Sequence, residues 1–346
     1  MRKSKKIMVG NVPVGGDSRI TVQSMLNIPA QDVKGNVRQA RKLADAGCEI
    51  LRVAVPDENS LALIPAIKDA VDLPLVADIH FDYRLAVEAA QAGADVIRIN
   101  PGNIGSDDRV KAVAETCRMR HIPIRIGVNS GSVQKEILAK YGGPTPRALA
   151  ESALHHAALL EKFDFRDMVL SIKSSNVETM IRANEIVSEN CDYPLHLGVT
   201  EAGTERMGIV KSAIGIGTLL REGIGDTIRV SLTADPVCEI QAGVDILKAL
   251  GLRGGVKIVS CPTCGRTKID LISIASEVER RLSGCHKDIT VAVMGCAVNG
   301  PGEACEADVG IAGGDGCGLI FRKGKIIRKV PESELIGELM REIDSL

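Results

Sequence analysis

The sequence contains no tryptophan and few aromatic residues of any kind. Aromatic side chains make up 2% of the 346 residues, so the platforms on which nucleic-acid bases stack are missing. The formal net charge is −1, which gives no overall field to attract nucleic acid or an acidic lipid surface. A nucleic-acid partner is therefore disfavoured, and the core must be built from Val, Ile, Leu and Ala.

Long apolar runs are also absent. No run approaches the roughly eighteen consecutive apolar residues of a membrane helix, and the basic start Met1-Arg-Lys-Ser-Lys-Lys6 does not lead into a signal peptide's apolar stretch. We therefore expect a cytoplasmic protein without a membrane partner. Its ten cysteines are expected to be reduced there, so clustered cysteines indicate metal or redox chemistry rather than disulfides.

A short β-branched run followed by an Ala-rich amphipathic helix recurs roughly every 25 to 35 residues. This alternation is typical of β-α units, and eight units predict an α/β fold with a closed (β/α)8 TIM barrel. A doubly wound open sheet is the alternative, but no Gly-x-Gly-x-x-Gly turn follows the first strand. The expected strands are Thr21–Met25, Ile50–Val55, Leu75–Ile79, Val96–Asn100, Ile124–Asn129, Met168–Lys173, Leu195–Thr200 and Thr227–Leu232.

Polar residues recur at every second position of these strands. Side chains alternate between the two faces of a strand, so residues two apart point the same way, and the apolar residues between them are expected to face the helices. The in-phase polar residues are Arg52, Asp78, His80, Arg98, Asn100, Arg125, Asn129, Ser171, Lys173, Arg229 and Ser231.

Barrel interiors are normally filled by branched apolar side chains, so this inward concentration of Arg and Lys requires an anionic partner. Asp78 neutralises part of the charge. The rest suits a diphosphate or a similar polyanion, held by bidentate guanidinium contacts. The alternative is that several of these cations pair with carboxylates on the barrel loops.

The pattern changes after the Gly-rich stretch Gly251-Leu-Arg-Gly-Gly255, where we place a domain boundary. Residues 1–253 are expected to form the barrel, and 254–346 a small α+β domain. In the second domain we expect a helix at Lys268–Leu282, strands at Ile289–Val293 and Asp308–Ile311, a hairpin at Gly318–Val330 that turns at Lys323-Gly324, and a final helix from Pro331 to about Ile343.

Three cysteines in glycine- and proline-rich turns mark this second domain. Cys261 and Cys264 form a Cys-x-x-Cys pair, and Cys296 begins a turn that ends in the acid Glu303. Thiolates favour zinc, copper(I) or an iron–sulfur cluster, so the alternatives are a cluster and a structural zinc site. Cys305 and Cys317 lie near the third cysteine, and either is an alternative fourth ligand.

Two motifs of the second domain, Cys261-Pro-Thr-Cys-Gly-Arg266 and Met294-Gly-Cys-Ala-Val-Asn-Gly-Pro-Gly-Glu-Ala304, resemble the cluster-binding signature of the 4-hydroxy-3-methylbut-2-enyl diphosphate synthases. Five strand-end segments resemble the same family in its shorter, two-domain form. They are Val22-Gln-Ser-Met25, Ala77-Asp-Ile-His80, Arg98-Ile-Asn-Pro-Gly102, Arg125-Ile-Gly-Val-Asn-Ser-Gly131 and Gly198-Val-Thr-Glu-Ala-Gly203.

The resemblance implies a 4Fe-4S cluster held by Cys261, Cys264, Cys296 and, as an exchangeable fourth ligand, Glu303. It implies reductive dehydration and ring opening of 2-C-methyl-D-erythritol 2,4-cyclodiphosphate in isoprenoid biosynthesis. Glu201 is our candidate acid, with Asp78 and His80 as second choices. The expected contacts to the substrate are Arg52, Arg98, Asn100, Arg125, Asn129, Lys173, Arg229 and Ser231.

The family further implies flavodoxin or ferredoxin as electron donor, and a head-to-tail homodimer in which one subunit's cluster domain caps the other's barrel. Two other functions remain open from the residues themselves. One is a barrel lyase or transferase that acts on a phosphorylated substrate and carries a structural zinc appendage. The other is a non-enzymatic iron–sulfur regulator, although a regulator has no need of a cationic barrel.

Overall fold

The computed structural model describes residues 2–297 and 304–346 and divides into two units, Met1–Leu250 and Gly251–Leu346. Our expected boundary, between 253 and 254, lies in the same Gly-rich stretch. The barrel is confirmed: an eight-stranded parallel sheet has the order β8-β7-β6-β5-β4-β3-β10-β9. Leu170 of β8 bridges to Leu195, just before β9, and this pairing brings the two ends of the sheet together. The strands are β3 Thr21–Met25, β4 Ile50–Ala54, β5 Leu75–Asp78, β6 Val96–Ile99, β7 Ile124–Asn129, β8 Met168–Lys173, β9 His196–Leu197 and β10 Thr227–Ile228.

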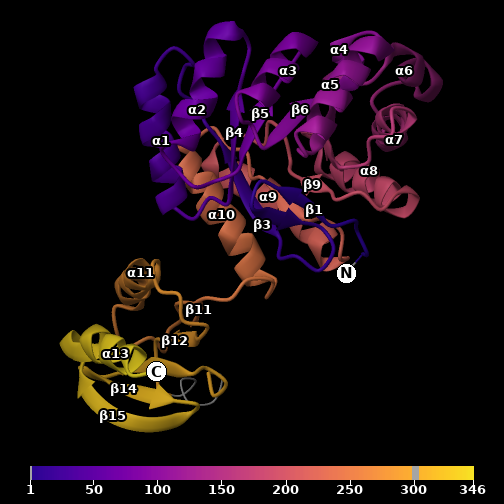
Figure 1. Cartoon of the computed structure of the whole chain (residues 1–346). Helices are drawn as coiled ribbons and strands as arrows, with labels where there is room; N and C mark the ends of the chain where they lie inside the picture. Colours follow the sequence, from indigo (N-terminus) through magenta and orange to yellow (C-terminus); the bar gives the residue numbers. More distant parts are fainter. Residues whose placement is uncertain (1, 298–303) are drawn as a thin grey trace. The chain divides into compact units, whose positions relative to one another are not determined.

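Helices connect successive strands and surround the sheet (Figure 1). Their starts follow local capping chemistry: Asp32 accepts a hydrogen bond from the amide of Gly35, and Pro236 occupies the first turn of its helix behind the cap Asp235. The helices are α1 Val33–Asp45, α2 Leu63–Lys68, α3 Tyr83–Gln91, α4 Pro101–Ile104, α5 Asp107–Met119, α6 Lys135–Tyr141, α7 Pro146–Lys162, α8 Val177–Asn190, α9 Glu205–Arg221 and α10 Pro236–Ala249, with 3-10 turns at Glu58–Ala62 and Ser130–Ser132.

An N-terminal hairpin closes the bottom of the barrel. Its strands β1 (Ile7–Val9) and β2 (Val12–Val14) pair antiparallel, and their apolar side chains pack on the first inward-facing residues of four barrel strands. Those residues are Ile50, Val76, Val96 and Val169. The interior is therefore apolar at its amino end, and the polar residues of the same phase lie nearer the carboxyl ends of the strands. Our sequence analysis did not predict this hairpin.

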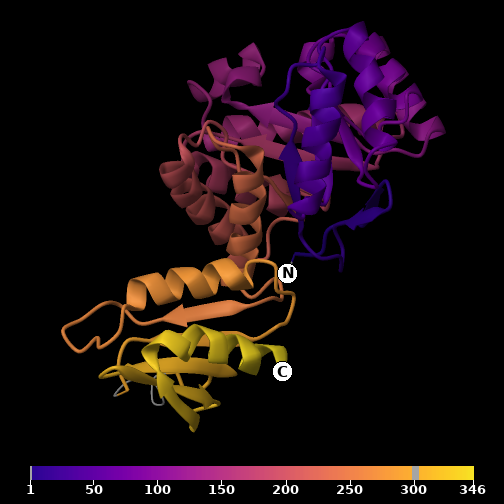
Figure 2. The same ribbon diagram turned by 90° about the vertical axis from the view of Figure 1, so that its left-hand side faces the viewer.

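The second unit is built on a five-stranded sheet with the order β11-β12-β13-β14-β15 (Figure 2). Its apolar core packs α11 and α13 against the sheet. The hairpin that turns at Lys323-Gly324 is confirmed, whereas the edge strand β11 was not predicted. The elements are β11 Lys257–Ser260, α11 Leu271–Leu282, β12 Thr290–Met294, β13 Val309–Gly314, β14 Cys317–Arg322, β15 Lys325–Pro331, a 3-10 turn Glu332–Glu334 and α13 Leu335–Asp344.

Two helices of this unit begin a few residues later than the sequence predicts. The helix expected from Lys268 begins at Leu271, because Asp270 caps it by accepting a hydrogen bond from the amide of Ser273. The last helix begins at Leu335, after a 3-10 turn that follows Pro331. Among the described residues of both units, no helix combines the length and the apolar character needed to span a membrane.

Candidate active site

Two adjoining cavities lie at the carboxyl ends of the barrel strands, where TIM-barrel active sites occur. Their volumes are about 510 and 110 Å³, and both are lined by Arg52, Arg98, Asn129 and Thr200. The larger cavity is also lined by His80, Asn100, Asn103, Ser130, Gly131, Ser132, Ser175 and Glu201. The smaller is also lined by Arg125, Val128, Ser171, Lys173, Arg229 and Ser231. The expected substrate-binding residues are therefore brought together around these two cavities.

Asp78 anchors two of the arginines. Its buried carboxylate accepts from Nη2 of Arg52 at 2.6 Å and from Nη1 of Arg98 at 3.0 Å. Burial alone would raise the pKa of Asp78, but the charges of Arg52 and Arg98 outweigh it and hold this pKa well below its ordinary value. Nε2 of His80 lies 3.7 Å from the same carboxylate. An ionised anchor of this kind positions guanidinium groups and is poorly suited to donate a proton.

Arg125 is only partly satisfied by hydrogen bonds. It is 1% exposed and donates from Nη1 to Oε1 of Gln23, whereas its Nε and Nη2 have no hydrogen-bond partner among the described residues. In the strand register Arg125 lies directly opposite Arg98, and like charges in that arrangement repel. Burial, followed by the charges of Arg52 and Arg98, lowers the pKa of Arg125.

Lys173 is in a similar position. Burial, and then the nearby charges led by Arg229 and Arg52, lower the pKa of Lys173 well below its ordinary value. Buried positive charge without a counter-ion is costly, and a bound polyanion would remove most of that cost. The barrel interior thus carries an excess of positive charge that a bound diphosphate would neutralise.

Two glycines make room for these long side chains. A Cβ atom at Gly127 would lie 2.3 Å from both Nε and Nη2 of Arg98. A Cβ atom at Gly198 would lie 3.0 Å from Nζ of Lys173 and 2.6 Å from the carbonyl oxygen of Arg229. Our sequence analysis quoted both glycines within motifs but gave them no role. Their role is to let cationic side chains cross neighbouring strands inside the barrel.

We expect Gly127→Ala to weaken binding of inorganic pyrophosphate by roughly 10- to 100-fold, because the methyl group displaces Arg98 from Asp78 and from the cavity, and a charged hydrogen bond contributes about 1.5 to 3 kcal/mol. Isothermal titration calorimetry measures the effect. Gly337→Ala is the control, since nothing lies within 4 Å of the added methyl group there. Equal affinity of Gly127→Ala and Gly337→Ala would contradict this role.

Glu201 follows β9 on a loop that is tethered on both sides. The amide of Thr200 donates to the carbonyl of Ser174 at 3.2 Å, and the amide of Thr233 donates to the carbonyl of Gly203 at 2.9 Å. Glu201 itself has a φ of 51°, a left-handed conformation that is strained for a residue other than glycine and that concentrates at functional sites. Among the described residues that line the two cavities, Glu201 is the one carboxylic acid.

Asn100 holds the loops around the larger cavity. Its side chain accepts from the amide of Gly102 at 3.0 Å and donates to the carbonyl of Ser132 at 3.2 Å. The backbone amide of Asn129 donates to Oγ of Ser132 at 3.0 Å. These bonds fix the loops after β6 and β7 against each other, so they shape the cavity wall even without a ligand.

The candidate metal ligands lie at one end of the small sheet. Cys261 and Cys264 follow β11, and Cys296 follows β12, which is the parallel neighbour of β11. The amide of Gly295 donates to Sγ of Cys261 at 3.1 Å, and the amide of Lys268 donates to the carbonyl of Gly295 at 2.9 Å. The two cysteine loops are thus joined through Gly295, and hydrogen bonds to thiolate sulfur are typical of iron–sulfur sites.

Among the described residues, no group of three or more His, Cys, Asp and Glu side chains is arranged to hold one metal ion. Glu303 lies outside the described residues, Cys305 is exposed, and Cys317 begins β14.

Hydrogen bonds from Arg266 lower the pKa of the exposed Cys264 thiol. A thiol with a lowered pKa more readily supplies the thiolate that binds a metal. Cys296 is by contrast buried.

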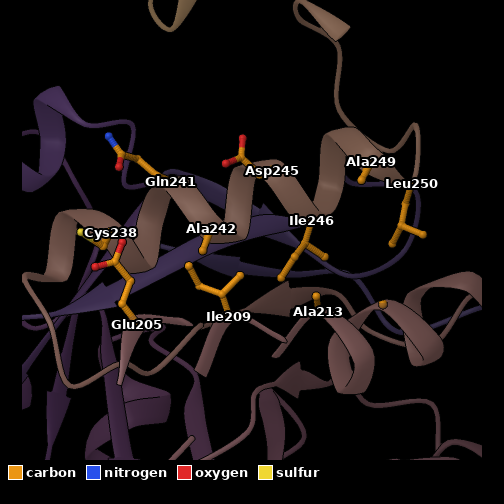
Figure 3. A pocket seen from close by; sticks show the side chains of 11 residues that line it. Glu205, Ile209, Ala213, Cys238, Gln241, Ala242, Asp245, Ile246, Ala249 and Leu250 are labelled. Carbon is orange, nitrogen blue, oxygen red and sulfur yellow. The ribbon is translucent and has the colours of Figure 1, made fainter. Parts of the chain in front are cut away.

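A third hollow lies on the outer surface of the barrel unit, between α9 and α10 (Figure 3). Its volume is about 440 Å³. Ala242 and Ile246 of α10 point toward Ile209 and Ala213 of α9, whereas Asp245 points away. The floor of this hollow is apolar, and none of its lining residues is shared with the strand-end cavities.

Two family models match the chain in sequence. One, described as the GcpE TIM-barrel domain, matches residues 4–244, and the other, described as the GcpE protein C-terminal domain, matches residues 257–345. A relative from Clostridium perfringens, named 4-hydroxy-3-methylbut-2-en-1-yl diphosphate synthase (flavodoxin), is 60% identical over 100% of this chain and 99% of its own length. A relative of the same name from Caldanaerobacter subterraneus subsp. tengcongensis is 59% identical, over 100% of this chain and 98% of its own length.

Solved structures that resemble the chain include dihydropteroate synthases. The enzyme from Stenotrophomonas maltophilia has a TM-score of 0.54 at 15% identity, over 72% of this chain and 97% of that chain. One from Yersinia pestis has a TM-score of 0.52 at 12% identity, over 72% of this chain and 100% of that chain. At such identity the likeness concerns the fold, and it is a likeness of the barrel class.

Proposed function

The chain belongs to the GcpE family, and from this premise we propose that it converts 2-C-methyl-D-erythritol 2,4-cyclodiphosphate into 4-hydroxy-3-methylbut-2-enyl diphosphate in isoprenoid biosynthesis. The cationic interior of the barrel mouth supports a diphosphate as substrate, because two buried guanidinium nitrogens of Arg125 have no hydrogen-bond partner among residues 2–297 and 304–346. The relatives' name supports the product, which is a diphosphate.

The basic side chains would hold the diphosphate. Arg52, Arg98, Arg125, Lys173 and Arg229 line the smaller cavity, and the carboxylate of Asp78 offsets part of their charge. Guanidinium groups bind phosphate oxygens in bidentate pairs, which fixes orientation as well as affinity. Asn129 and Ser231 would add neutral donors. The carbon skeleton would then point toward the larger cavity, where Glu201 lies.

The second unit would hold a 4Fe-4S cluster through Cys261, Cys264 and Cys296, with Glu303 as fourth ligand. The joined cysteine loops and the Gly295 amide bond to Cys261 support this proposal. When bound, such a cluster supplies electrons one at a time and a Lewis-acidic iron.

The proposed reaction is balanced in atoms and in charge. Two electrons and one proton enter the cyclic dianion, a ring C–O bond opens, and water and the linear diphosphate trianion leave. Arg98 and Arg125 would stabilise the charge that develops on the freed diphosphate. Glu201 would protonate the departing hydroxyl oxygen so that it leaves as water. Closing the site around the substrate would keep bulk water away from the reduced intermediate.

Flavodoxin is the electron donor named in the relatives, and we propose flavodoxin or ferredoxin here, in a cytoplasmic setting. An acidic donor would require basic residues near the cluster loops. Lys268 pairs with Asp315 at 3.4 Å and Arg322 with Glu342 at 2.9 Å, so their charge is partly used. Lys323 and Lys325 are exposed at the β14–β15 turn, but the strand register puts this turn at the other end of the sheet from the cysteine loops, so Lys268, whose amide bonds to Gly295, is the nearer candidate.

We further propose a homodimer, in which one subunit's cluster domain serves the partner's barrel. The outward face of α9 offers a surface on which a second copy of the chain could pack. Met207, Val210 and Ile214 are 50%, 45% and 54% exposed on successive turns, where barrel helices usually present polar residues. This ridge lies beside the apolar groove of Figure 3, and a two-fold interface requires a surface that carries both of its complementary features.

We expect Ile214→Glu to raise the dimer dissociation constant by at least about 100-fold, because a carboxylate buried at a symmetric contact without a partner costs several kcal/mol per copy. Sedimentation equilibrium measures this. Ile272→Glu is the control, as Ile272 is 68% exposed on α11. A dimer of Ile214→Glu as tight as the control would exclude the α9 face.

Anaerobic incubation of the iron-loaded protein with the cyclodiphosphate and reduced flavodoxin, followed by mass spectrometry of the products, tests the proposed function. Hydroxymethylbutenyl diphosphate is the expected product. A barrel lyase or transferase with a zinc appendage is the alternative. Zinc without acid-labile sulfide in the purified protein, with no diphosphate product, would favour it.

A further inference from the structure

Glu239 is a buried acid in the first turn of α10 that the sequence analysis did not single out. It is 3% exposed. Its Oε1 accepts from the amide of Leu232 at 3.0 Å, and its Oε2 accepts from Oγ of Ser24 at 3.1 Å and from Nε of Arg229 at 3.4 Å. One carboxylate therefore joins strand β3, the cavity residue Arg229 and the backbone that follows β10.

The backbone from Arg229 to Leu232 lies between the end of strand β10 and Glu239. The β10 ladder ends at Ile228, and the amide of Arg229 makes one further bond, to the carbonyl of Leu197 at 2.9 Å. Ser231, which lines the smaller cavity, lies between this bond and the Leu232 amide that Glu239 holds. The cavity-lining segment 229–232 is thus fixed at one end by the sheet and at the other by Glu239, together with the Thr233 amide, which donates to the carbonyl of Gly203 at 2.9 Å.

The position of the Arg229 side chain also depends on Glu239. Its other contact in the described structure is a weak one, from Nη1 to the sulfur of Met25 at 3.5 Å. A guanidinium held by a carboxylate through Nε still has its terminal nitrogens to offer a second anion. Glu239 therefore fixes one side of the Arg229 guanidinium, and Arg229 lines the smaller cavity.

We propose that Glu239 is a positioning residue for diphosphate recognition: it sets the orientation of Arg229 and of the Ser231 segment while touching no substrate itself. This inference rests on the proposed function, because it assigns the diphosphate to the smaller cavity. Glu239 lies in the first turn of α10 and bonds to Arg229, Ser24 and the Leu232 amide at once, so a single side chain positions all three.

A simple counter-charge would behave in the opposite way. If Glu239 acted only by offsetting positive charge, its neutralisation would leave the cavity more cationic, and an anion would bind as tightly as before or more tightly. If Glu239 acts by positioning, its neutralisation misplaces Arg229, and an anion binds more weakly. The direction of the change in affinity separates the two roles.

The experiment is isothermal titration of inorganic pyrophosphate into the cluster-loaded, full-length protein under anaerobic conditions. We expect Glu239→Gln to raise the dissociation constant by about tenfold or more, since it replaces a charged hydrogen bond. Glu239→Asp keeps the charge but draws the carboxylate back, and it is expected to weaken binding as well. The control is Glu338→Gln, which removes an equally helical, buried acid that pairs with Arg328 and Arg341 in the other unit.

A thermal melt accompanies each titration. A loss of stability with an unchanged dissociation constant for both Glu239 variants would show a merely structural role and would overturn the inference, as would tighter binding by Glu239→Gln. If Glu239→Gln does not fold, Glu239→Asp decides by the same criterion. Wild-type protein that does not bind pyrophosphate would overturn the proposed function instead, so the two failures are distinct.

Discussion

Replacing Glu201 by Gln is expected to lower kcat by roughly 10²- to 10⁴-fold, which is the usual contribution of a positioned general acid. Glutamine keeps the size of the side chain, so the strained loop and the larger cavity should keep their shape. KM should change little, because the diphosphate contacts lie on the arginine and lysine side chains of the smaller cavity. Steady-state kinetics with reduced methyl viologen measures both constants.

Glu222→Gln is the matched control, an exposed acid at the end of α9, and it should turn over like the wild type. A Glu201→Gln enzyme with wild-type kcat would remove Glu201 as the acid. His80 would then be the next candidate, because it also lines the larger cavity, whereas the ionised Asp78 is held by two arginines.

Replacing Cys296 by Ser is expected to abolish turnover and to release iron, because a serine oxygen is a poor ligand for the soft iron of a cluster. Pyrophosphate binding should persist, since the barrel is a separate unit with its own core. Iron and sulfide analysis, together with the titration of pyrophosphate, reads out both effects.

Cys305→Ser serves as the contrasting variant. Cys305 is exposed and lies two residues after Glu303 in the sequence. If Glu303 is the fourth ligand, the Cys305→Ser protein should keep its full iron content. Loss of iron from Cys305→Ser would transfer that role to Cys305. Retention of the full iron content by Cys296→Ser would contradict the cluster assignment itself.

The barrel and its polar interior could be predicted from the sequence because both depend on local patterns. One is the repeat of strand and helix along the chain, and the other is the alternation of side chains along a strand. Strand residues alternate between faces, so Arg98 and Arg125 were expected on the same side as Asn129 before their shared cavity was known. The eight strands were located, but β9 and β10 were expected to be longer than the structure has them. After Leu197 and Ile228 the chain leaves the ladder and its polar groups bond to loops and to Glu239.

The parts that were missed depend on contacts between distant segments. Glu239 lies in a helix whose pattern is that of any amphipathic barrel helix, and its partners Ser24 and Arg229 come from other elements. Gly127 resembles any strand glycine until Arg98 is seen to cross it. Gln23 could have been found, because it shares the inward phase of β3 and meets Arg125. The edge strand β11 is short and mostly exposed, which leaves no alternating pattern.

The measurement that tests the account most directly counts electrons against product in one anaerobic cuvette. Iron-loaded protein, the cyclodiphosphate and reduced methyl viologen are combined, and dye oxidation is followed while hydroxymethylbutenyl diphosphate is quantified. Because the dye gives one electron and ring opening with loss of water takes two, the account predicts two dye molecules oxidised per product formed. Product without dye oxidation, or no product from protein with an intact cluster that binds pyrophosphate, would contradict it.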